Sequence, residues 1–339
     1  MKVDPFSKAC PTVRKVNGKY VNPYLKSSKR SLYDFLLLQL GYYNEEAPLA
    51  QVPHDFSYPN PKEAHSGDEP HASWINHSTF YVSCDGCNIL TDPIWSTRCS
   101  PFSFIGPKRG HEPGIQLDML PPIHLVLISH NHYDHLDEAT VQTLNQRNPD
   151  CVWVVPTGVK QWLEKRGMKN VVELSWWEGS EHLFQEQKLQ LKITAVPTQH
   201  FSGRGLFDRD NTLWAGYVVD FSRKQKPAKR LYFCGDSGYN QYDFKQIGER
   251  FGGMDLSLIP VGTYVPSSFM QTVHMNPKQA TAVHQDVRSK LSIGMHWKTF
   301  RLSMEPSDQP PYDLYLSMKE AGLDPHCFRI LEPGQVINW

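Results

Sequence analysis

The sequence predicts an α/β fold in which layers of strands and helices enclose one core. Short apolar runs typical of buried strands recur from about residue 72 onward, and stretches typical of helices lie between them. Several of the strand-like runs are followed by a histidine or an aspartate. The carboxyl ends of strands border the binding crevice in layered α/β folds, so the same pattern predicts where the functional site lies.

The expected elements follow one another without a tandem repeat or a low-complexity tract. A chain of 339 residues can bury a large core within one domain. Cys84-Asp85-Gly86-Cys87 predicts a hairpin, because Asp-Gly favours the tight turn between paired strands. We expect strands at 78–82, 88–90, 124–128, 152–155, 191–199, 230–235 and 291–295. We expect helices at 138–146, 158–165, 242–251 and 278–287, the last opened by Asn276 and Pro277.

The composition of the chain changes near residue 71. Proline and lysine are frequent before it, and 54–71 has the polar, proline-bearing character of a connection. The regular alternation of elements begins afterwards. We therefore expect an amino-terminal extension over 1–71 and one main domain over 72–339.

Within the extension, residues 31–41 have the pattern of an amphipathic helix. Leu32, Phe35 and Leu36 fall on one face, and Gly41 is a suitable stop. Three basic residues precede this stretch: Lys26, Lys29 and Arg30. The pattern fits a helix that enters lipid headgroups while its cations meet anionic lipid. It also fits a helix that packs on the core, and the sequence alone leaves both interpretations open.

The overall composition narrows the class of protein. Lys plus Arg and Asp plus Glu both total 35, so no global basic field indicates nucleic acid as a partner. The seven cysteines are an odd number, and the start of the chain lacks the apolar core of a signal peptide, which together favour a reducing, intracellular setting. No run approaches the roughly 18 apolar residues of a membrane span, so we expect any membrane contact to be peripheral.

One short motif carries most of the chemical information. The run Ser129-His130-Asn131-His132-Tyr133-Asp134-His135 holds three imidazoles and a carboxylate directly after the expected strand 124–128. Borderline metals such as zinc favour this mixture of neutral imidazole and carboxylate. The motif therefore predicts a metal centre at the end of that strand.

Three further ligand-type residues lie beyond other strand-like runs: His200, Asp236 and His296. A single histidine in such a place is more often a structural residue. Several such places in one chain favour a shared metal centre instead.

The His-x-His-x-Asp-His motif, followed by a distant His, Asp and His, resembles the metallo-β-lactamase superfamily. The resemblance implies a four-layer αββα sandwich with a two-metal site between two sheets, and an amino-terminal extension is added to it here. It implies that His130, His132 and His200 hold one metal and that Asp134, His135 and His296 hold the other. The resemblance also implies that Asp236 bridges both metals. By the same resemblance, Asp92 orients a ligating histidine through a hydrogen bond, whereas a turn residue before proline is the plainer interpretation.

Several segments resemble one family within that superfamily, the phospholipases D that hydrolyse N-acyl phosphatidylethanolamine. These segments are 90–96, 106–109, 127–137, 235–239, 247–252 and 259–262. Val273 and Lys298 depart from the family pattern, which puts headgroup recognition in doubt. The resemblance implies two Zn²⁺ ions, a phospholipid substrate, and attack on phosphorus by a metal-bound hydroxide that yields an N-acylethanolamine and phosphatidic acid.

Two more residues are candidates for catalysis beside the bridging Asp236. His274 lies just before the expected helix 278–287 and would bind phosphate or protonate the leaving alkoxide; a capping or core histidine is the alternative. Tyr133 would bind phosphate or pack beside the metals. Four aromatic residues are weaker candidates for an acyl groove: Trp95, Phe102, Phe104 and Phe269. Lys108 and Arg109 are expected in a solvated loop.

Two other functions compete with this hypothesis. One keeps the fold but takes a small phosphorylated lactone or another ester, and the other is a non-catalytic lipid-binding scaffold. The complete ligand set argues against the scaffold. The resemblance further implies a peripheral protein on the cytosolic face of endomembranes such as Golgi or endosomes, and it leaves a homodimer open.

Overall fold

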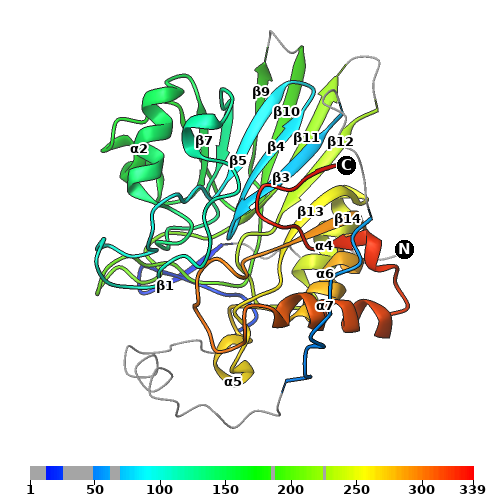
Figure 1. Cartoon of the computed structure of the whole chain (residues 1–339). Helices are drawn as coiled ribbons and strands as arrows, with labels where there is room; N and C mark the ends of the chain where they lie inside the picture. Colours follow the sequence, from blue (N-terminus) through cyan, green and yellow to red (C-terminus); the bar gives the residue numbers. More distant parts are fainter. Residues whose placement is uncertain (1–12, 26–48, 62–68, 185–187, 224–226) are drawn as a thin grey trace, which may run out of the picture.

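A computed structural model describes residues 13–25, 49–61, 69–184, 188–223 and 227–339. The four-layer arrangement that the family resemblance implies is confirmed, with two mixed sheets facing each other and helices on the outer faces (Figure 1). The first sheet has the strand order β16 (Val336–Asn338), β3 (His71–Asn76), β4 (Thr79–Cys84), β5 (Cys87–Thr91), β6 (Leu125–Leu127), β7 (Val152–Pro156) and β8 (Val171–Leu174). The second has the order β15 (Phe328–Arg329), β14 (Ser289–Met295), β13 (Met254–Pro260), β12 (Lys229–Phe233), β11 (Gly216–Arg223), β10 (Leu189–Val196) and β9 (Gly179–Phe184).

Helices cover the outer face of each sheet. The first sheet is covered by α2 (Glu138–Arg147) and α3 (Lys160–Glu164). The second is covered by α4 (Asp243–Phe251), α6 (Pro277–Asp286) and α7 (Gln309–Glu320). Three short elements complete the description: η2 (Leu117–Met119), α5 (Ser267–Met270) and η3 (Pro325–Cys327). No helix in the described ranges is both long enough and apolar enough to cross a bilayer.

The core consists of two main clusters that explain the apolar runs. One fills the space between the sheets and the layer under α4, α6 and α7, where Trp74, Phe80 and Phe233 are fully buried. The other lies under α2 and α3, where Trp153 packs with Val141 and Leu163. Strands β5 to β8 pair in parallel, as do β12 to β15. Parallel strands covered on both faces have nearly continuous apolar sequences, which is why these segments were recognisable.

The expected hairpin turn is confirmed. Cys84 and Cys87 face each other at the end of the antiparallel pair β4 and β5. Asp85 and Gly86 between them have φ angles of 49° and 80°, as a tight turn with two left-handed residues requires.

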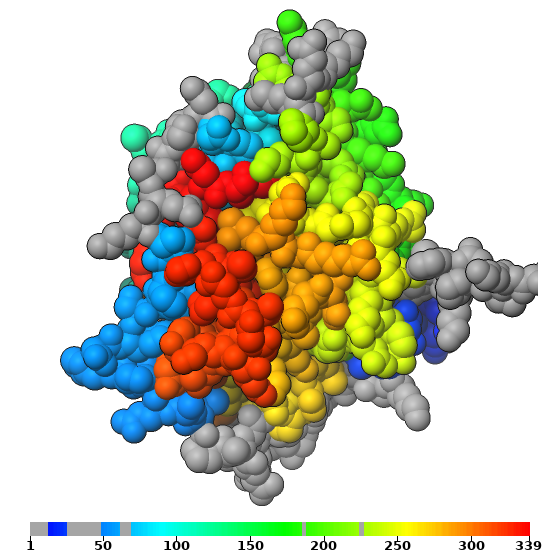
Figure 2. All heavy atoms as spheres, turned by 90° about the vertical axis from the view of Figure 1, so that its right-hand side faces the viewer, coloured from blue at the N-terminus to red at the C-terminus, as the bar shows by residue number. Residues whose placement is uncertain are grey.

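The described parts of the amino-terminal region pack against the main domain. The hairpin β1 (Arg14–Val16) and β2 (Lys19–Val21) is fixed by a hydrogen bond from Tyr20 N to Asp210 O of 2.9 Å. Residues 49–61 lie along α7 (Figure 2), where the Phe56 and Tyr312 rings are 4.9 Å apart. The domain boundary at residue 71 stays a prediction. The expected helix over 31–41, with Leu32, Phe35 and Leu36, lies outside the described residues.

Candidate metal centre

The loop after β6 places the histidine motif at the carboxyl ends of the parallel strands of the first sheet. Its turn is closed by hydrogen bonds from His135 N and Leu136 N to His132 O, of 3.2 and 2.9 Å. The other expected ligands come from the second sheet, after β10, β12 and β14. The site thus lies where the ends of both sheets meet.

Three imidazoles form the first group. His130 Nε2 lies 2.8 Å from His132 Nδ1, and His200 Nε2 lies 3.3 Å from the same atom. The outer nitrogens of two of these rings are fixed elsewhere. His130 Nδ1 is 2.8 Å from Ser129 Oγ, and His200 Nδ1 is 2.9 Å from Val273 O. Each of these two rings therefore directs its remaining nitrogen toward the group.

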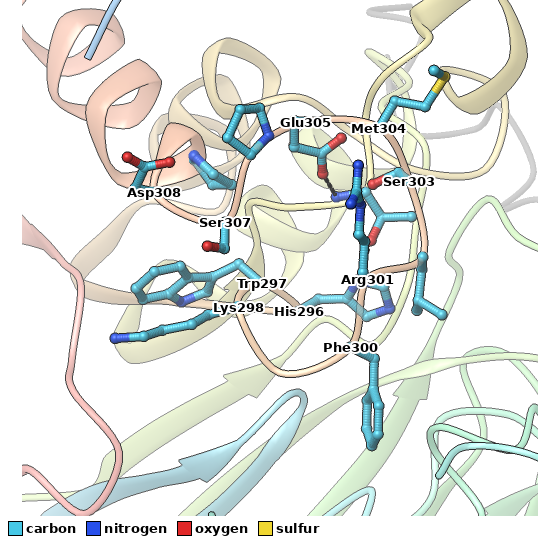
Figure 3. A pocket seen from close by; sticks show the side chains of 14 residues that line it. His296, Trp297, Lys298, Phe300, Arg301, Ser303, Met304, Glu305, Ser307 and Asp308 are labelled. Atoms are coloured by element: carbon cyan, nitrogen blue, oxygen red, sulfur yellow. Dashed lines mark hydrogen bonds between the residues drawn. The ribbon is translucent and has the colours of Figure 1, made fainter. Parts of the chain in front are cut away.

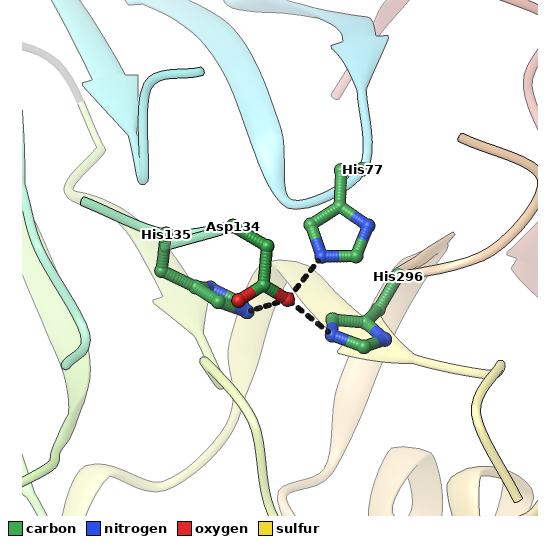
Figure 4. Close-up of side chains that lie close together, drawn as sticks. All are labelled: His77, Asp134, His135 and His296. Carbon is green, nitrogen blue, oxygen red and sulfur yellow. Dashed lines mark hydrogen bonds and ion pairs between the residues drawn. The ribbon is translucent and has the colours of Figure 1, made fainter. Parts of the chain in front are cut away.

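The second group is formed around the Asp134 carboxylate (Figure 4). Asp134 Oδ2 lies 3.2 Å from His135 Nε2 and 3.5 Å from His296 Nε2. Both imidazoles are fully buried. The opposite nitrogen of His296 is 3.0 Å from Thr263 Oγ1, which directs its Nε2 toward the carboxylate.

Asp236 lies between the two groups. Its Oδ2 is 3.0 Å from His296 Nε2 and 3.2 Å from His135 Nε2, both in the second group. The same oxygen is 3.7 Å from His200 Nε2 in the first group. One carboxylate oxygen thus reaches nitrogens of both groups.

The site has the donor set of a divalent metal centre. Asp236 Oδ1 is buried at the centre without a hydrogen-bond partner among the described residues, and His135 Nε2 and His296 Nε2 lie only 3.0 to 3.5 Å from carboxylate oxygens. Buried polar atoms without partners are costly, and such orphans often mark an ion. Imidazole nitrogens and carboxylate oxygens at this separation are the ligands that zinc and similar metals use. The residues therefore fit a metal centre.

The charges within the site favour ionised carboxylates. Burial acts to raise the pKa of Asp236, but His135 and His296 outweigh it and hold the pKa well below its usual range. Burial acts to lower the pKa of His135, but Asp236 and Asp134 raise it well above its ordinary value. In the absence of a metal, protonated imidazole supplies the positive charge that these carboxylates require.

Asp92 accepts hydrogen bonds from two residues of the motif, Ser129 and His135. It is fully buried, and its Oδ2 accepts from His135 Nδ1 at 2.6 Å and from Ser129 Oγ at 2.5 Å. Its Oδ1 accepts from Ser129 N at 2.7 Å. These bonds hold the His135 ring with its Nε2 facing Asp134 and Asp236, the arrangement by which an outer carboxylate fixes a ligand.

His77 belongs to the second group and was not expected from the sequence. It occupies the turn between β3 and β4 with a φ of 41° and is buried. Its Nε2 donates to Asp134 Oδ2 at 2.9 Å. Burial lowers the pKa of His77 to about 3, so the neutral ring is the donor. The only sequence signal was a histidine in a tight turn between two strands.

The turn that carries His77 is attached to the loop that carries His296. His77 N donates to Thr299 Oγ1 at 2.7 Å, and His296 N donates to His77 O at 3.0 Å. Trp74 Nε1 also donates to His77 O, at 2.9 Å. His77 therefore connects three segments of the chain to the Asp134 carboxylate.

We expect His77→Leu to weaken metal binding at the second group about tenfold or more, because Asp134 loses the donor that orients it. His77→Gln can place an N–H near the same position, so it should retain more affinity with the same backbone strain. Competition of the purified variants against a chromogenic chelator measures this. Metal retention by His77→Leu equal to that of the parent would show that Asp134 needs no help from His77.

His274 lies at the edge of the site between both groups. Its Nδ1 is 3.9 Å from Asp236 Oδ2 and has no hydrogen-bond partner among the described residues. Its ring is 5.1 Å from that of His200 and 5.2 Å from that of His296. It precedes α6, for which the expected cap at Asn276 and proline in the first turn are confirmed, and Gln279 completes a capping box with Asn276. His274 is thus placed to contact a group bound at the centre.

Tyr133 is tied to the loop after β10. Its hydroxyl donates to Arg204 O at 3.0 Å, and the Arg204 guanidinium lies 4.0 Å from the centre of its ring. The Arg204 side chain also donates to Asn131 O and Leu136 O, at 2.9 and 2.7 Å. This arrangement favours a packing role for Tyr133, since its proton is already used.

Arg109 differs from the expectation of a solvated loop. It is buried, and its guanidinium donates to Ser96 O at 3.0 and 3.1 Å and to Ile94 O at 3.3 Å. The side chain fastens the loop that follows β5 instead of facing solvent. Lys108 beside it is exposed.

Two pockets adjoin the ligand cluster. One of about 400 Å³ is bordered by His296, with Trp297, Arg301 and Glu305 among its other residues (Figure 3). The other, of about 520 Å³, is bordered by Tyr133 and Arg204. The first pocket thus reaches one expected ligand, His296, whereas the second is lined by Asn131 and Tyr133, which lie between expected ligands in the sequence.

Comparison with known proteins shows the family of the chain. Residues 87–297 match the family described as the Beta-lactamase superfamily domain. The chain is 39% identical over 255 residues to "N-acyl-phosphatidylethanolamine-hydrolyzing phospholipase D 1" of Caenorhabditis elegans, which covers 72% of this chain and 70% of the nematode protein. It is 33% identical over 257 residues to the mitochondrial enzyme of that name from Saccharomyces cerevisiae, covering 76% of this chain and 53% of the yeast protein.

A solved structure supports the fold alone. Igni18, a metallo hydrolase of Ignicoccus hospitalis, aligns with 80% of this chain and 98% of its own at a TM-score of 0.55 and 21% identity. The chain therefore belongs to the β-lactamase superfamily and, within it, to the family of N-acyl-phosphatidylethanolamine-hydrolysing phospholipases D.

Proposed function

We propose that this metal-dependent hydrolase cleaves N-acyl phosphatidylethanolamine into phosphatidic acid and an N-acylethanolamine, with two zinc ions as cofactors. The observation that carries the proposal is the position of Asp236 Oδ2 between two groups of buried ligands. The substrate is inferred from the relatives of the chain.

The proposed ligands divide as the two groups do. His130, His132 and His200 would hold one metal, and Asp134, His135 and His296 the other. Asp236 would serve both, because a carboxylate can bridge two ions and an imidazole cannot. When bound, the metals would lower the pKa of a water molecule and neutralise charge on a phosphoryl oxygen.

The residues around the centre have separate tasks in this proposal. His274 would bind the phosphate or supply a proton to the leaving alkoxide. Ser129 is unsuited as a nucleophile, because its hydroxyl bonds to Asp92 and lies at the Nδ1 edge of His130, away from the cluster. Water is therefore the proposed nucleophile. Peripheral contact with the membrane would bring the lipid to the site, with Leu32, Phe35 and Leu36 as one proposed contact.

Incubation of the purified protein with detergent-dispersed N-acyl phosphatidylethanolamine tests this function. We expect both products by mass spectrometry, loss of turnover after chelation, and recovery when zinc is restored. Phosphatidylethanolamine without the N-acyl chain and a phosphorylated lactone serve as comparison substrates. Absence of both products from the zinc-loaded protein, or faster turnover of the lactone, would contradict the proposal.

A further inference from the structure

Two loops near the candidate metal centre expose large apolar side chains at their tips. Phe102, Phe104 and Ile105 lie in the loop after β5, with 78% of Phe104 exposed. Leu206 and Phe207 lie in the loop after β10, with 90% of Phe207 exposed. These exposures leave most of each side chain in water, which is unfavourable unless another apolar phase covers it.

The first loop has a fixed base. Arg98 and Lys108 face each other in an antiparallel bridge, and Cys99 N donates to Pro107 O at 3.2 Å. The buried Arg109 adjoins this base. At the tip, the rings of Phe102 and Phe104 are 5.6 Å apart. The backbone thus holds the apolar tip away from the core.

The second loop is held in a similar way. The Asp208 carboxylate accepts from Arg204 N at 3.0 Å and from Gly205 N at 2.7 Å, which fixes a turn beside Leu206 and Phe207. Lys19 Nζ donates to Phe207 O at 3.1 Å. The Arg204 side chain fastens the base of the loop to the carbonyl of Asn131 within the ligand motif.

The two loops border one pocket. Pro101 of the first loop and Arg204, Gly205 and Asp208 of the second line the same cavity as Tyr133. Tyr133 lies between two of the expected metal ligands in the sequence. The exposed apolar residues therefore belong to the two loops that border this pocket.

The charges at this pocket are close to balanced. Its lining has three cations, Lys165, Arg166 and Arg204, and two carboxylates, Glu138 and Asp208. These lining residues therefore create no strong positive potential that would attract anionic lipid. Apolar insertion is then the main available driving force, and aromatic residues at membrane interfaces provide it.

We propose that these two loop tips insert into the outer part of a phospholipid bilayer and place the pocket between them against the lipid surface. Separate protruding tips on either side of an opening suit a soft lipid surface better than a flat protein partner. The inference deepens the proposed function and rests on it for the choice of lipid as the partner. It differs from the contact proposed for Leu32, Phe35 and Leu36 and depends on none of those residues.

Sedimentation with vesicles of phosphatidylcholine tests this surface. Phe104→Asp combined with Phe207→Asp should lower the partition coefficient of the zinc-loaded protein at least about tenfold, because each charge opposes insertion. The combined Phe104→Leu and Phe207→Leu variant should bind within about threefold of the parent, since leucine is also apolar. Phosphatidylglycerol added to the vesicles should change binding less than the aspartate substitutions do.

Leu183→Asp is the matched control. Leu183 is 65% exposed in strand β9, at the opposite end of the molecule from β1 (Figure 1), and Lys19 beside β1 contacts the second loop. This control should bind like the parent.

The proposal fails if the double aspartate variant binds like the parent, if Leu183→Asp weakens binding equally, or if the parent does not bind these vesicles. It also fails if the double aspartate variant binds vesicles like the parent but converts a dimer into monomers, because the tips would then be a protein interface. Sedimentation does not depend on hydrolysis. The result therefore tests membrane insertion even if the enzyme acts on a substrate other than the one proposed.

Discussion

Asp236→Asn is expected to lower kcat/KM about a thousandfold, which corresponds to about 4 kcal/mol of barrier. Asp236 Oδ2 lies within 3.0 to 3.7 Å of nitrogens from both ligand groups. A neutral amide keeps the shape of the carboxylate but removes the negative charge that two cations would share. Steady-state kinetics on detergent-dispersed N-acyl phosphatidylethanolamine, with the metal content measured in parallel, checks this result.

Asp243→Asn is the matched control for this substitution. Asp243 is as buried as Asp236, at 2% against 3% exposed, but it lies in α4 and bonds to Asn240. Burial raises its pKa to about 6, so an amide is a mild change there. We expect activity within about threefold of the parent, with both variants folded by circular dichroism. Activity of Asp236→Asn within tenfold of the parent, about 1.4 kcal/mol, would remove Asp236 from its proposed place.

The proposed metal ligands could be predicted from the sequence because each lies directly after, or a few residues after, a recognisable strand. The motif 129–135 follows a strand whose side chains are all buried, and such a strand is recognisable by its apolar run. His200, Asp236 and His296 follow other strands in the same way. The ends of these strands lie at one edge of the sandwich. The position of each residue after a strand was therefore sufficient to predict that the residues lie close together.

His77 was missed because its partner lies far along the chain. Nothing around it resembles a ligand motif, and a turn histidine is ordinarily exposed. Its burial depends on how the β3–β4 turn meets the His296 loop through Thr299. Such a contact between loops is a property of the assembled sandwich and has no local sequence pattern.

Helix α7 and the buried Arg109 were missed for related reasons. α7 begins with Gln309, Pro310 and Pro311, and paired prolines are typical of turns and loops. Proline is nevertheless tolerated in the first turn of a helix, where its missing N–H costs nothing. Arg109 is buried because carbonyls of Ile94 and Ser96 converge on it, and that arrangement forms only when the loop folds back.

The second large effect concerns the bond that breaks. A phosphoryl oxygen placed between the two ligand groups would bring phosphorus next to Asp236, whereas the ethanolamine carbon lies two bonds further away, beyond the ester oxygen. We therefore expect water to attack phosphorus, with His274 beside the leaving group. This route transfers the oxygen of water to phosphatidic acid and leaves the original oxygen in the ethanolamide.

Turnover of N-acyl phosphatidylethanolamine in heavy-oxygen water measures this directly by mass spectrometry of both products. Unlabelled phosphatidic acid incubated with the same protein in heavy-oxygen water controls for oxygen exchange after cleavage. We expect one heavy oxygen in the phosphate of nearly every phosphatidic acid formed and none in the N-acylethanolamine. Heavy oxygen in the hydroxyl of the N-acylethanolamine would show that the carbon–oxygen bond breaks and would contradict the account.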